Sequence, residues 1–261
     1  MKENFLGKGS QTIIGMVHCL PLPGTYGFDG DYNKIIEQAV QDAITLEKAG
    51  VDAVIVENMG DTPFSALLDK LQVAALTTAA LKVKEAVSIP IGIDAAFCDC
   101  EAALAIAGVC GADFVRIPVF VDTVLFSDGI IYPCARQCIN LRRHMKLEHV
   151  KILADVQVKH AHMLNPQITV EMSAKDAAGN GADGIIVTGA LIGAETPLDM
   201  LQRVKKVVDI PVFAGSGINA GNIHNQLQIA DGCIIGSALK KGGVLTNPID
   251  YDLVREVVSA L

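Results

Sequence analysis

Polar and ionisable side chains stand at the ends of short apolar runs along this 261-residue sequence. Carboxylates in such positions can act as a general base, a metal ligand or the partner of a Schiff-base lysine. The alternative is a structural ion pair with Arg116 or Lys159, which would also satisfy a buried charge. Lys159 is itself a conceivable Schiff-base lysine, although nothing in the sequence marks it as desolvated. The candidate catalytic residues are His18, Glu57, Asn58, Asp94, Arg116, Asp155, Lys159 and His160.

Two glycine-serine turns carry a second chemical signal. Gly215-Ser216-Gly217 precedes the helical stretch AGNIHNQLQ, and Gly236-Ser237 opens a second turn before a helix. Glycines let the backbone approach an anion closely, and the free N–H groups at a helix start bind phosphate. The alternative is that these glycines only form tight turns between a strand and the following helix. Because both turns carry Gly-Ser, we expect them to hold a phosphate or another anion.

Histidine spacing raises the question of a metal. His18 precedes the rigid turn PLPG and is the best single histidine for acid–base work or metal binding. In an extended segment, His160 and His162 would project to the same side and could share a divalent metal. A solvated loop is the alternative for this pair.

The seven cysteines are expected to be free thiols, most of them buried. Neither of their two closely spaced pairs has the C-x-x-C spacing of a structural zinc site. Lys240 and Lys241 are expected either in a solvated helix start or beside a phosphate. The two cysteine pairs are Cys98-x-Cys100 and Cys134-x-x-x-Cys138.

The strands that must position these residues repeat along the chain. Four segments share a small residue, then an aspartate, then a short β-branched run. Continuous apolar runs of this kind are buried on both faces, as in parallel sheets. Asp52, Asp113, Asp183 and Asp231 lie at strand beginnings, where we expect them to cap helices or turns. The eight expected strands are 13–18, 53–57, 90–94, 113–117, 151–155, 184–188, 211–214 and 232–236.

Helix-period stretches separate the strands, most clearly at 32–50, 64–87 and 199–208. Eight strand–helix units in one chain of this length predict an α/β fold, a TIM (β/α)₈ barrel made of a single domain over residues 1–261. A doubly wound open sheet is the alternative. In a barrel the carboxyl ends of the strands form the catalytic rim. The irregular segment 118–140 follows the fourth strand and is expected to be a loop or lid over the site.

Composition excludes several classes of protein. The chain is 51% hydrophobic with a formal net charge of −8, which argues against disorder and against a general nucleic-acid binder. No signal peptide and no apolar run long enough to span a membrane is present in the sequence. We therefore expect a cytoplasmic protein without an integral membrane segment, and we expect it to form a homo-oligomer.

Several motifs together resemble the BtpA/SgcQ family over about residues 12–258: MVHCLPLPGT, AGVDAVIVEN, FSDGIIYPCARQCINLRR, ADVQVKHA and IADGCIIGSALKKGGVLTNPID. The resemblance implies a TIM barrel, with associations to photosystem I biogenesis and to a sugar-related gene cluster. After the third strand this chain reads IGIDAAFCDC where the family more often reads like GVNVLRND, so Asp94 replaces an amide. The residues that match the family by position are His18, Pro21, Pro23, Gly24, Glu57, Asn58, Asp155, Lys159, His160, Asp231, Gly232, Lys240, Asn247 and Pro248.

These signals support three functional hypotheses. The first is an enzyme acting on a small phosphorylated metabolite, such as a phosphosugar or a nucleotide-like compound, by isomerisation, aldol cleavage or hydrolysis. The second is a non-catalytic assembly or regulatory factor that uses the barrel as a binding scaffold. The third is a metal-dependent hydrolase using His18, Glu57, Asp155 and the His160/His162 pair. The sequence contains no recognisable flavin or pyridoxal signature. The one cofactor that it suggests is a divalent metal.

Overall fold

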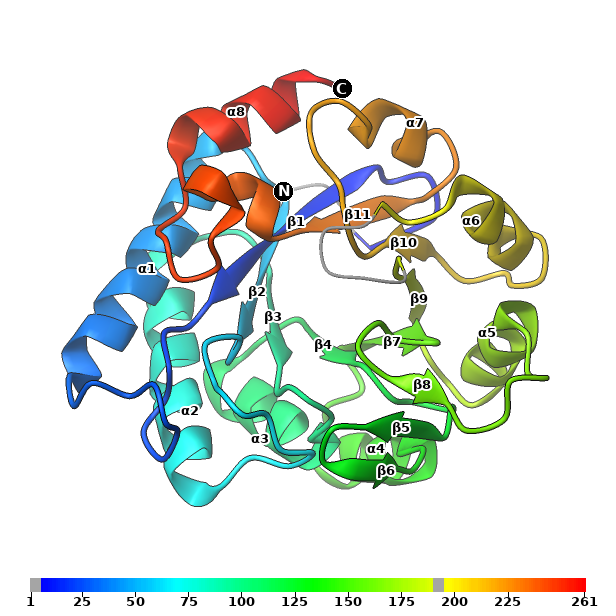
Figure 1. The fold of residues 1–261 in the computed structure, drawn as a ribbon, viewed down its shortest axis with the longest axis horizontal. Coiled ribbons are helices and arrows are strands. Elements are labelled where there is room, and N and C mark those ends of the chain that lie inside the picture. Colours follow the sequence, from blue (N-terminus) through cyan, green and yellow to red (C-terminus); the bar gives the residue numbers. More distant parts are fainter. Residues whose placement is uncertain (1–5, 190–194) are drawn as a thin grey trace.

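Eight parallel strands close into a barrel in the computed structural model, which describes residues 6–189 and 195–261. Their order around the barrel is β1-β11-β10-β9-β7-β4-β3-β2, and helices surround them (Figure 1). The predicted TIM barrel is confirmed, and each predicted strand end lies within one residue of the observed one. The barrel strands are β1 (Thr12–His18), β2 (Ala53–Glu57), β3 (Ile91–Asp94), β4 (Phe114–Ile117), β7 (Lys151–Val156), β9 (Gly184–Val187), β10 (Val212–Ala214) and β11 (Gly232–Ile235).

The helices lie outside the strands and cover their outer faces through small and branched apolar side chains. None of the helices in the described ranges is long and apolar enough to cross a membrane. The α-helices are α1 (Tyr32–Ala49), α2 (Lys70–Ala86), α3 (Cys100–Cys110), α4 (Ala135–His144), α5 (Val170–Gly179), α6 (Leu198–Lys205), α7 (Ile223–Leu227) and α8 (Tyr251–Ser259). Two short 3₁₀ turns, η1 (Ser237–Leu239) and η2 (Lys241–Gly243), follow β11.

The helix predicted over 64–87 begins later, at Lys70. The Asp69 carboxylate accepts the N–H groups of Leu71 and Gln72, and the Gln72 side-chain oxygen accepts the N–H of Asp69. This reciprocal capping box fixes the start of α2. The residues before it are therefore free to run across the barrel mouth, where Phe64 lines the cavity described below.

Two phenylalanines fill the barrel interior. Phe114 and Phe213 are fully buried there, and each lies against a glycine of a neighbouring strand. A Cβ atom added to Gly92 would stand 2.3 Å from the Phe114 ring, and one added to Gly232 would stand 2.7 Å from the Phe213 ring. Glycine is required at these two positions because a larger residue would occupy the space of the ring.

The four aspartates at strand beginnings were expected to cap helices or turns. Asp231 does accept the N–H of Gly9, in the turn before β1, at 2.7 Å, but the arrangement that all four share is a different one. Each joins its own strand to the preceding one: the carboxylate accepts the N–H of a residue at the start of that strand, whose carbonyl accepts the N–H of the aspartate. Geometry makes this possible, because adjacent parallel strands begin side by side. The pairs are Asp52 with Ile13, Asp113 with Ile91, Asp183 with Ile152 and Asp231 with Val212.

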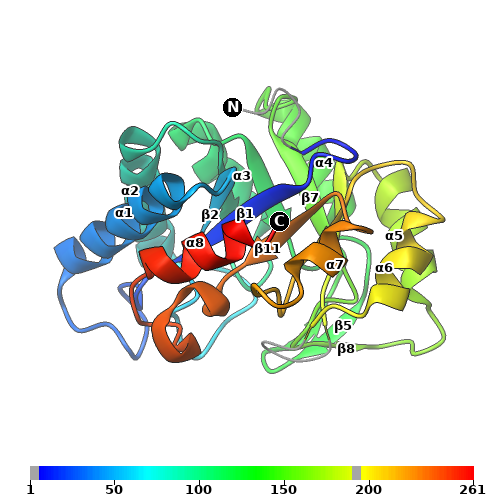
Figure 2. The ribbon, with the colours of Figure 1, turned by 90° about the horizontal axis from the view of Figure 1, so that it is seen from above.

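The segment 118–140 is more ordered than a loop. It contains the hairpin of β5 (Val124–Phe126) and β6 (Gly129–Ile131) and the first residues of α4. A third strand, β8 (His162–Met163), pairs with β5, giving an antiparallel sheet of order β6-β5-β8. In Figure 2 this sheet lies beyond the same end of the barrel as the orange segment that follows β11. It is a structured addition at the rim that carries the candidate site.

Candidate functional site

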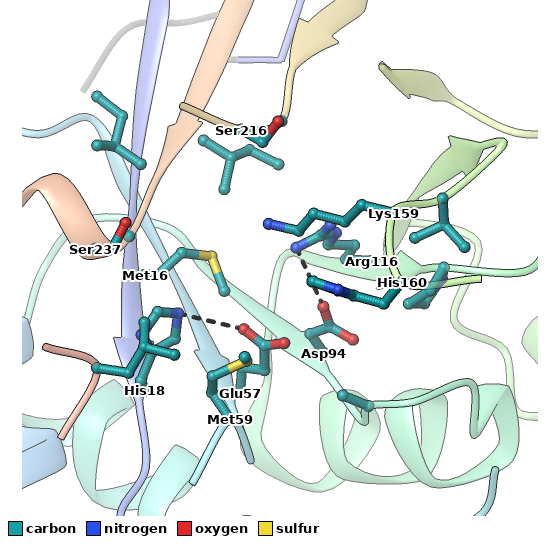
Figure 3. A pocket seen from close by; sticks show the side chains of 18 of the residues that line it. Met16, His18, Glu57, Met59, Asp94, Arg116, Lys159, His160, Ser216 and Ser237 are labelled. Carbon is teal, nitrogen blue, oxygen red and sulfur yellow. Dashed lines mark ion pairs between the residues drawn. The ribbon is translucent and has the colours of Figure 1, made fainter. Parts of the chain in front are cut away.

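A cavity of about 380 Å³ opens at the carboxyl ends of the barrel strands (Figure 3). Eleven of the thirteen predicted site residues line it: His18, Glu57, Asp94, Arg116, Lys159, His160, Gly215, Ser216, Gly217, Gly236 and Ser237. The remaining two, Asn58 and Asp155, are fully buried and do not line it. The barrel thus brings to one place residues that lie up to 219 positions apart in the sequence.

Strand register places three of these side chains next to one another. His18 of β1 pairs with Glu57 of β2, and Glu57 pairs with Asp94 of β3. The Nε2 atom of His18 lies 3.5 Å from Oε2 of Glu57. All three side chains are at least nine-tenths buried. They form a continuous row of acid–base groups along one wall of the cavity, as Figure 3 shows.

Burial sets the protonation of this row. It lowers the pKa of His18 from 6.5 to about 3, assisted by the positive charges of Lys240, Lys159 and Arg116. Burial raises the pKa of Glu57, and it raises that of Asp94 well above the usual range, with the Glu57 charge adding to the effect. His18 is therefore a neutral base at physiological pH, beside carboxyl groups whose protonated form is favoured. Such a row can both donate and accept protons.

Arg116 of β4 holds two carboxylates. Its Nε and one terminal nitrogen donate to the two oxygens of Asp155 at 2.9 and 2.8 Å, and its other terminal nitrogen lies 3.5 Å from Asp94 Oδ2. Asp155 is behind Arg116 and is wholly occupied by this bidentate pair. It orients the guanidinium toward the cavity, which is the structural ion pair that the sequence left as an alternative.

Asn58 shapes the neighbouring loop. Its side-chain oxygen accepts the N–H of Ala96 at 2.8 Å, and its amide nitrogen donates to Asp61 and to the Ala96 carbonyl, both at 2.9 Å. These hydrogen bonds go to the backbone of Ala96 and to the Asp61 carboxylate, and Asn58 itself does not line the cavity. Asn58 thus supports the turn after β3, which carries the cavity-lining residues Ala96 and Phe97.

The two glycine-serine turns lie side by side at the cavity but differ in which N–H groups they offer. Gly215 donates its N–H to the Val187 carbonyl, and Ser216 donates its own to Thr196 Oγ1. Within residues 6–189 and 195–261, the N–H groups of Gly217, Gly236 and Ser237 find no protein acceptor. These three backbone donors, rather than the whole of both motifs, are available to an anion.

The candidate histidine pair, His160 with His162, is not brought together at the cavity. His160 has a left-handed backbone with φ of 70° and lines the cavity, whereas His162 is exposed in β8 and does not. The segment is a tight turn, not the extended chain that sharing a metal would require. Burial lowers the pKa of His160, assisted by Lys159 and Arg116.

The cysteines and Lys240 also lie outside the cavity. None of the seven cysteines forms a disulfide, and the thiols of Cys98 and Cys134 both donate to the Val119 carbonyl, at 3.4 and 3.3 Å. Lys240 is not solvated: it is buried, donates to the Asn247 carbonyl at 2.6 Å and lies 3.5 Å from Asp42. In the described part of the chain, no three His, Cys, Asp or Glu side chains are grouped so as to hold a metal.

Sequence reasoning missed the apolar wall of the cavity. Met16, Met59, Phe64, Phe97 and Phe126 line it, and the rings of Phe97 and Phe126 stack with centroids 4.0 Å apart. No local pattern distinguishes these residues from ordinary core side chains. Their common position, at or just beyond strand ends and in the added β5–β6 hairpin, becomes visible only in the folded barrel.

Solved structures of low sequence identity share this fold. Thiamine phosphate pyrophosphorylase from Pyrococcus furiosus superposes with a TM-score of 0.59 at 14% identity, covering 97% of this chain and 96% of that one. The (S)-3-O-geranylgeranylglyceryl phosphate synthase from Thermoplasma acidophilum, solved with its substrate sn-glycerol-1-phosphate, gives 0.60 at 17% identity, covering 96% and 92%. At these identities the likeness establishes the barrel fold alone.

Relatives of higher identity cover nearly the whole chain. An uncharacterized protein of Pyrococcus furiosus is 42% identical over 94% of this chain and 93% of its own length. The photosystem I biogenesis protein BtpA of Synechocystis sp. is 37% identical over 95% of this chain and 87% of its own. The sequence model of the BtpA family matches residues 9–261. This chain therefore belongs to the BtpA family.

Proposed function

We propose that this protein is an enzyme that acts on a small phosphorylated metabolite, bound with its phosphate at Gly217, Gly236 and Ser237. One observation carries the proposal: three residues whose backbone N–H groups find no acceptor in the described chain line the same cavity as the buried row His18–Glu57–Asp94. Backbone donors in glycine turns suit phosphate, and the loops after the last two barrel strands are a frequent phosphate site.

Arg116 brings a positive charge to the cavity, which also suits an anion. It lines the cavity together with Lys159 and His160, beside the acidic row. A phosphate held at the glycine turns would place the rest of a small molecule between the acid–base row and the apolar wall. The names of the two structural neighbours given above include phosphorylated compounds, which supports a phosphorylated substrate for this protein.

Thermal unfolding in the presence of ligands tests the proposal. We expect phosphorylated sugars to raise the Tm, and their unphosphorylated counterparts at equal concentration to leave it unchanged. Gly236→Ala should abolish the shift, because its Cβ would stand 2.9 Å from the His18 ring. Gly179→Ala, where a Cβ meets nothing within 4 Å, is the matched control and should retain it. Equal shifts with and without phosphate would contradict the proposal.

The name of the Synechocystis relative favours a second candidate, an assembly factor that uses the barrel to bind rather than to react. The two candidates differ at Glu57. For an enzyme, Glu57→Gln retains the ligand-induced Tm shift and loses turnover of the ligand. For a binding scaffold, neither wild type nor variant turns the ligand over.

We also propose that the protein is cytoplasmic, forms a homo-oligomer and binds no nucleic acid. The acidic composition supports the last point, since phosphate backbones are held by basic patches. Light scattering coupled to size-exclusion chromatography measures the oligomeric state. A molar mass near 27.5 kDa in solution would contradict the oligomer.

A further inference from the structure

Lys159 is presented by a rigid turn after β7. Two non-glycine residues of the turn, Gln157 and His160, have left-handed backbones with φ of 47° and 70°. The Gln157 N–H donates to Asp122 Oδ2 at 2.8 Å, and the Lys159 N–H donates to Thr188 Oγ1 at 3.1 Å. Left-handed backbone costs free energy outside glycine and persists where surrounding contacts enforce it. Here those contacts fix where the Lys159 side chain begins.

The Lys159 side chain reaches into the centre of the cavity, between Ser216 and the acidic row (Figure 3). Among the described residues, its ammonium forms no hydrogen bond and no ion pair. The buried Lys240 differs because it is held by Asn247 and Asp42. A structural lysine would be satisfied in the same way, whereas Lys159 is aimed at whatever occupies the cavity.

The surroundings of Lys159 favour its neutral amine. Burial lowers the pKa of Lys159, and the neighbouring Arg116 guanidinium lowers it further. The charges of Glu57 on β2, Asp155 on β7 and Asp94 on β3 oppose this, and the lowered pKa is the balance. Desolvation beside a second cation is the environment that makes a lysine a nucleophile, since only the unprotonated amine can attack a carbonyl carbon.

We propose that Lys159 forms a Schiff base with the carbonyl carbon of a phosphorylated aldehyde or ketone. The amine lone pair forms the new C–N bond, and the carbonyl oxygen leaves as water. In net, two hydrogens of the amine depart with that oxygen. Glu57 and Asp94 can supply the proton that assists departure of the oxygen, because burial favours their protonated forms. The phosphate part of this inference rests on the proposed function, and the amine chemistry does not.

Reductive trapping tests the inference. The protein is incubated with dihydroxyacetone phosphate, reduced with sodium borohydride and digested, and each lysine peptide is analysed by mass spectrometry. We expect Lys159 to carry the reduced adduct at about tenfold or more the level of any other lysine. Lys159→Met should lose the adduct, and Lys151→Met, at the exposed opposite end of β7, should keep it. Adduct spread evenly over the lysines, or its absence from Lys159, would overturn the inference.

The peptide map of the wild-type protein shows whether Lys159 carries the adduct, even where Lys159→Met does not fold.

Unphosphorylated dihydroxyacetone separates this inference from the proposed function. Equal labelling of Lys159 by both probes, unaffected by Gly236→Ala, supports the nucleophile and contradicts the phosphate site. Failure of both probes to label Lys159 overturns the nucleophile, while a phosphate-dependent Tm shift would still support the phosphate site.

Discussion

At the scale of single residues, the site separates carboxylates by their environment. Both oxygens of Asp155 accept hydrogen bonds from Arg116. Asp94 lies 3.5 Å from the same guanidinium, and its Oδ1 has no hydrogen-bond partner within the described part of the chain. Sequence position alone marks both as strand-end carboxylates. The distinction between an orienting residue and a reactive one depends on the Arg116 rotamer, which only tertiary packing determines.

These environments predict different effects on the free energy of unfolding for two similar substitutions. Asp155→Asn should lower the free energy of unfolding by about 3–5 kcal/mol, because it breaks a buried bidentate pair. Asp94→Asn should not destabilise the protein at pH 8. Since the folded state raises the pKa of Asp94, this group's contribution to stability falls as pH rises above the ordinary carboxyl value. Urea unfolding at pH 8 measures both, and equal destabilisation would contradict this account.

The lowered pKa of His18 predicts how the free energy of unfolding depends on pH. Its pKa is about 3 in the folded protein and 6.5 ordinarily, so below pH 6.5 the unfolded chain binds a proton that the folded chain does not. This contribution to stability is present above pH 6.5 and is lost toward lower pH, by up to roughly 1.4 kcal/mol per pH unit. His18→Gln should have a shallower acid limb in urea unfolding curves measured between pH 7 and 4. Parallel limbs in the two proteins would refute the neutral His18.

At the scale of elements, the segments that follow the barrel strands supply much of the cavity lining. The positions of the eight barrel strands were predictable from apolar runs, because a strand buried on both faces has a strong composition signal. The rim was not. Phe64 was assigned to a helix because its segment is apolar, and the capping box at Asp69 overrides that pattern. In the small rim sheet, β8 pairs with β5 from a later part of the chain, a contact that periodicity cannot predict.

The turn that carries Lys159 yields a prediction at this scale. Asp122 accepts the Gln157 N–H through one oxygen and the Ser173 hydroxyl, at 2.6 Å, through the other, and it does not line the cavity. Asp122→Ala should reduce borohydride trapping at Lys159 because the turn loses a support, and should cost about 1–3 kcal/mol of stability. Asp128→Ala, which removes an exposed acceptor of the Ala66 N–H, is the control. Unchanged trapping in a folded Asp122→Ala protein would show that the turn is held without it.

At the scale of the whole molecule, the barrel is built from four similar quarters. Each quarter is a pair of neighbouring strands joined at its beginning by one aspartate. The repeat was visible in the sequence, but its physical role was not, since a strand-initial aspartate also suits a helix cap. The stabilising contacts thus gather at one end of the barrel and the candidate chemistry at the other, as is usual for this fold.

This separation of stability from chemistry can be tested. Asp183 accepts the Ile152 N–H and pairs with Arg142 at 2.6 Å and Lys151 at 3.2 Å. Asp183→Ala should lower the free energy of unfolding by about 2–3 kcal/mol. In the folded fraction, ligand-induced Tm shifts should match those of the wild type. A loss of ligand response would show that the two ends of the barrel are coupled.

The proposed function places phosphate in the cavity at the N–H groups of Gly217, Gly236 and Ser237, which find no acceptor among the described residues. A crystal structure of the protein grown in inorganic phosphate tests it most directly. We predict a phosphate within hydrogen-bond distance of all three nitrogens, in the cavity that Lys159 also lines. An adequately resolved cavity with no anion there, and with those N–H groups bonded to protein atoms, would contradict the claim.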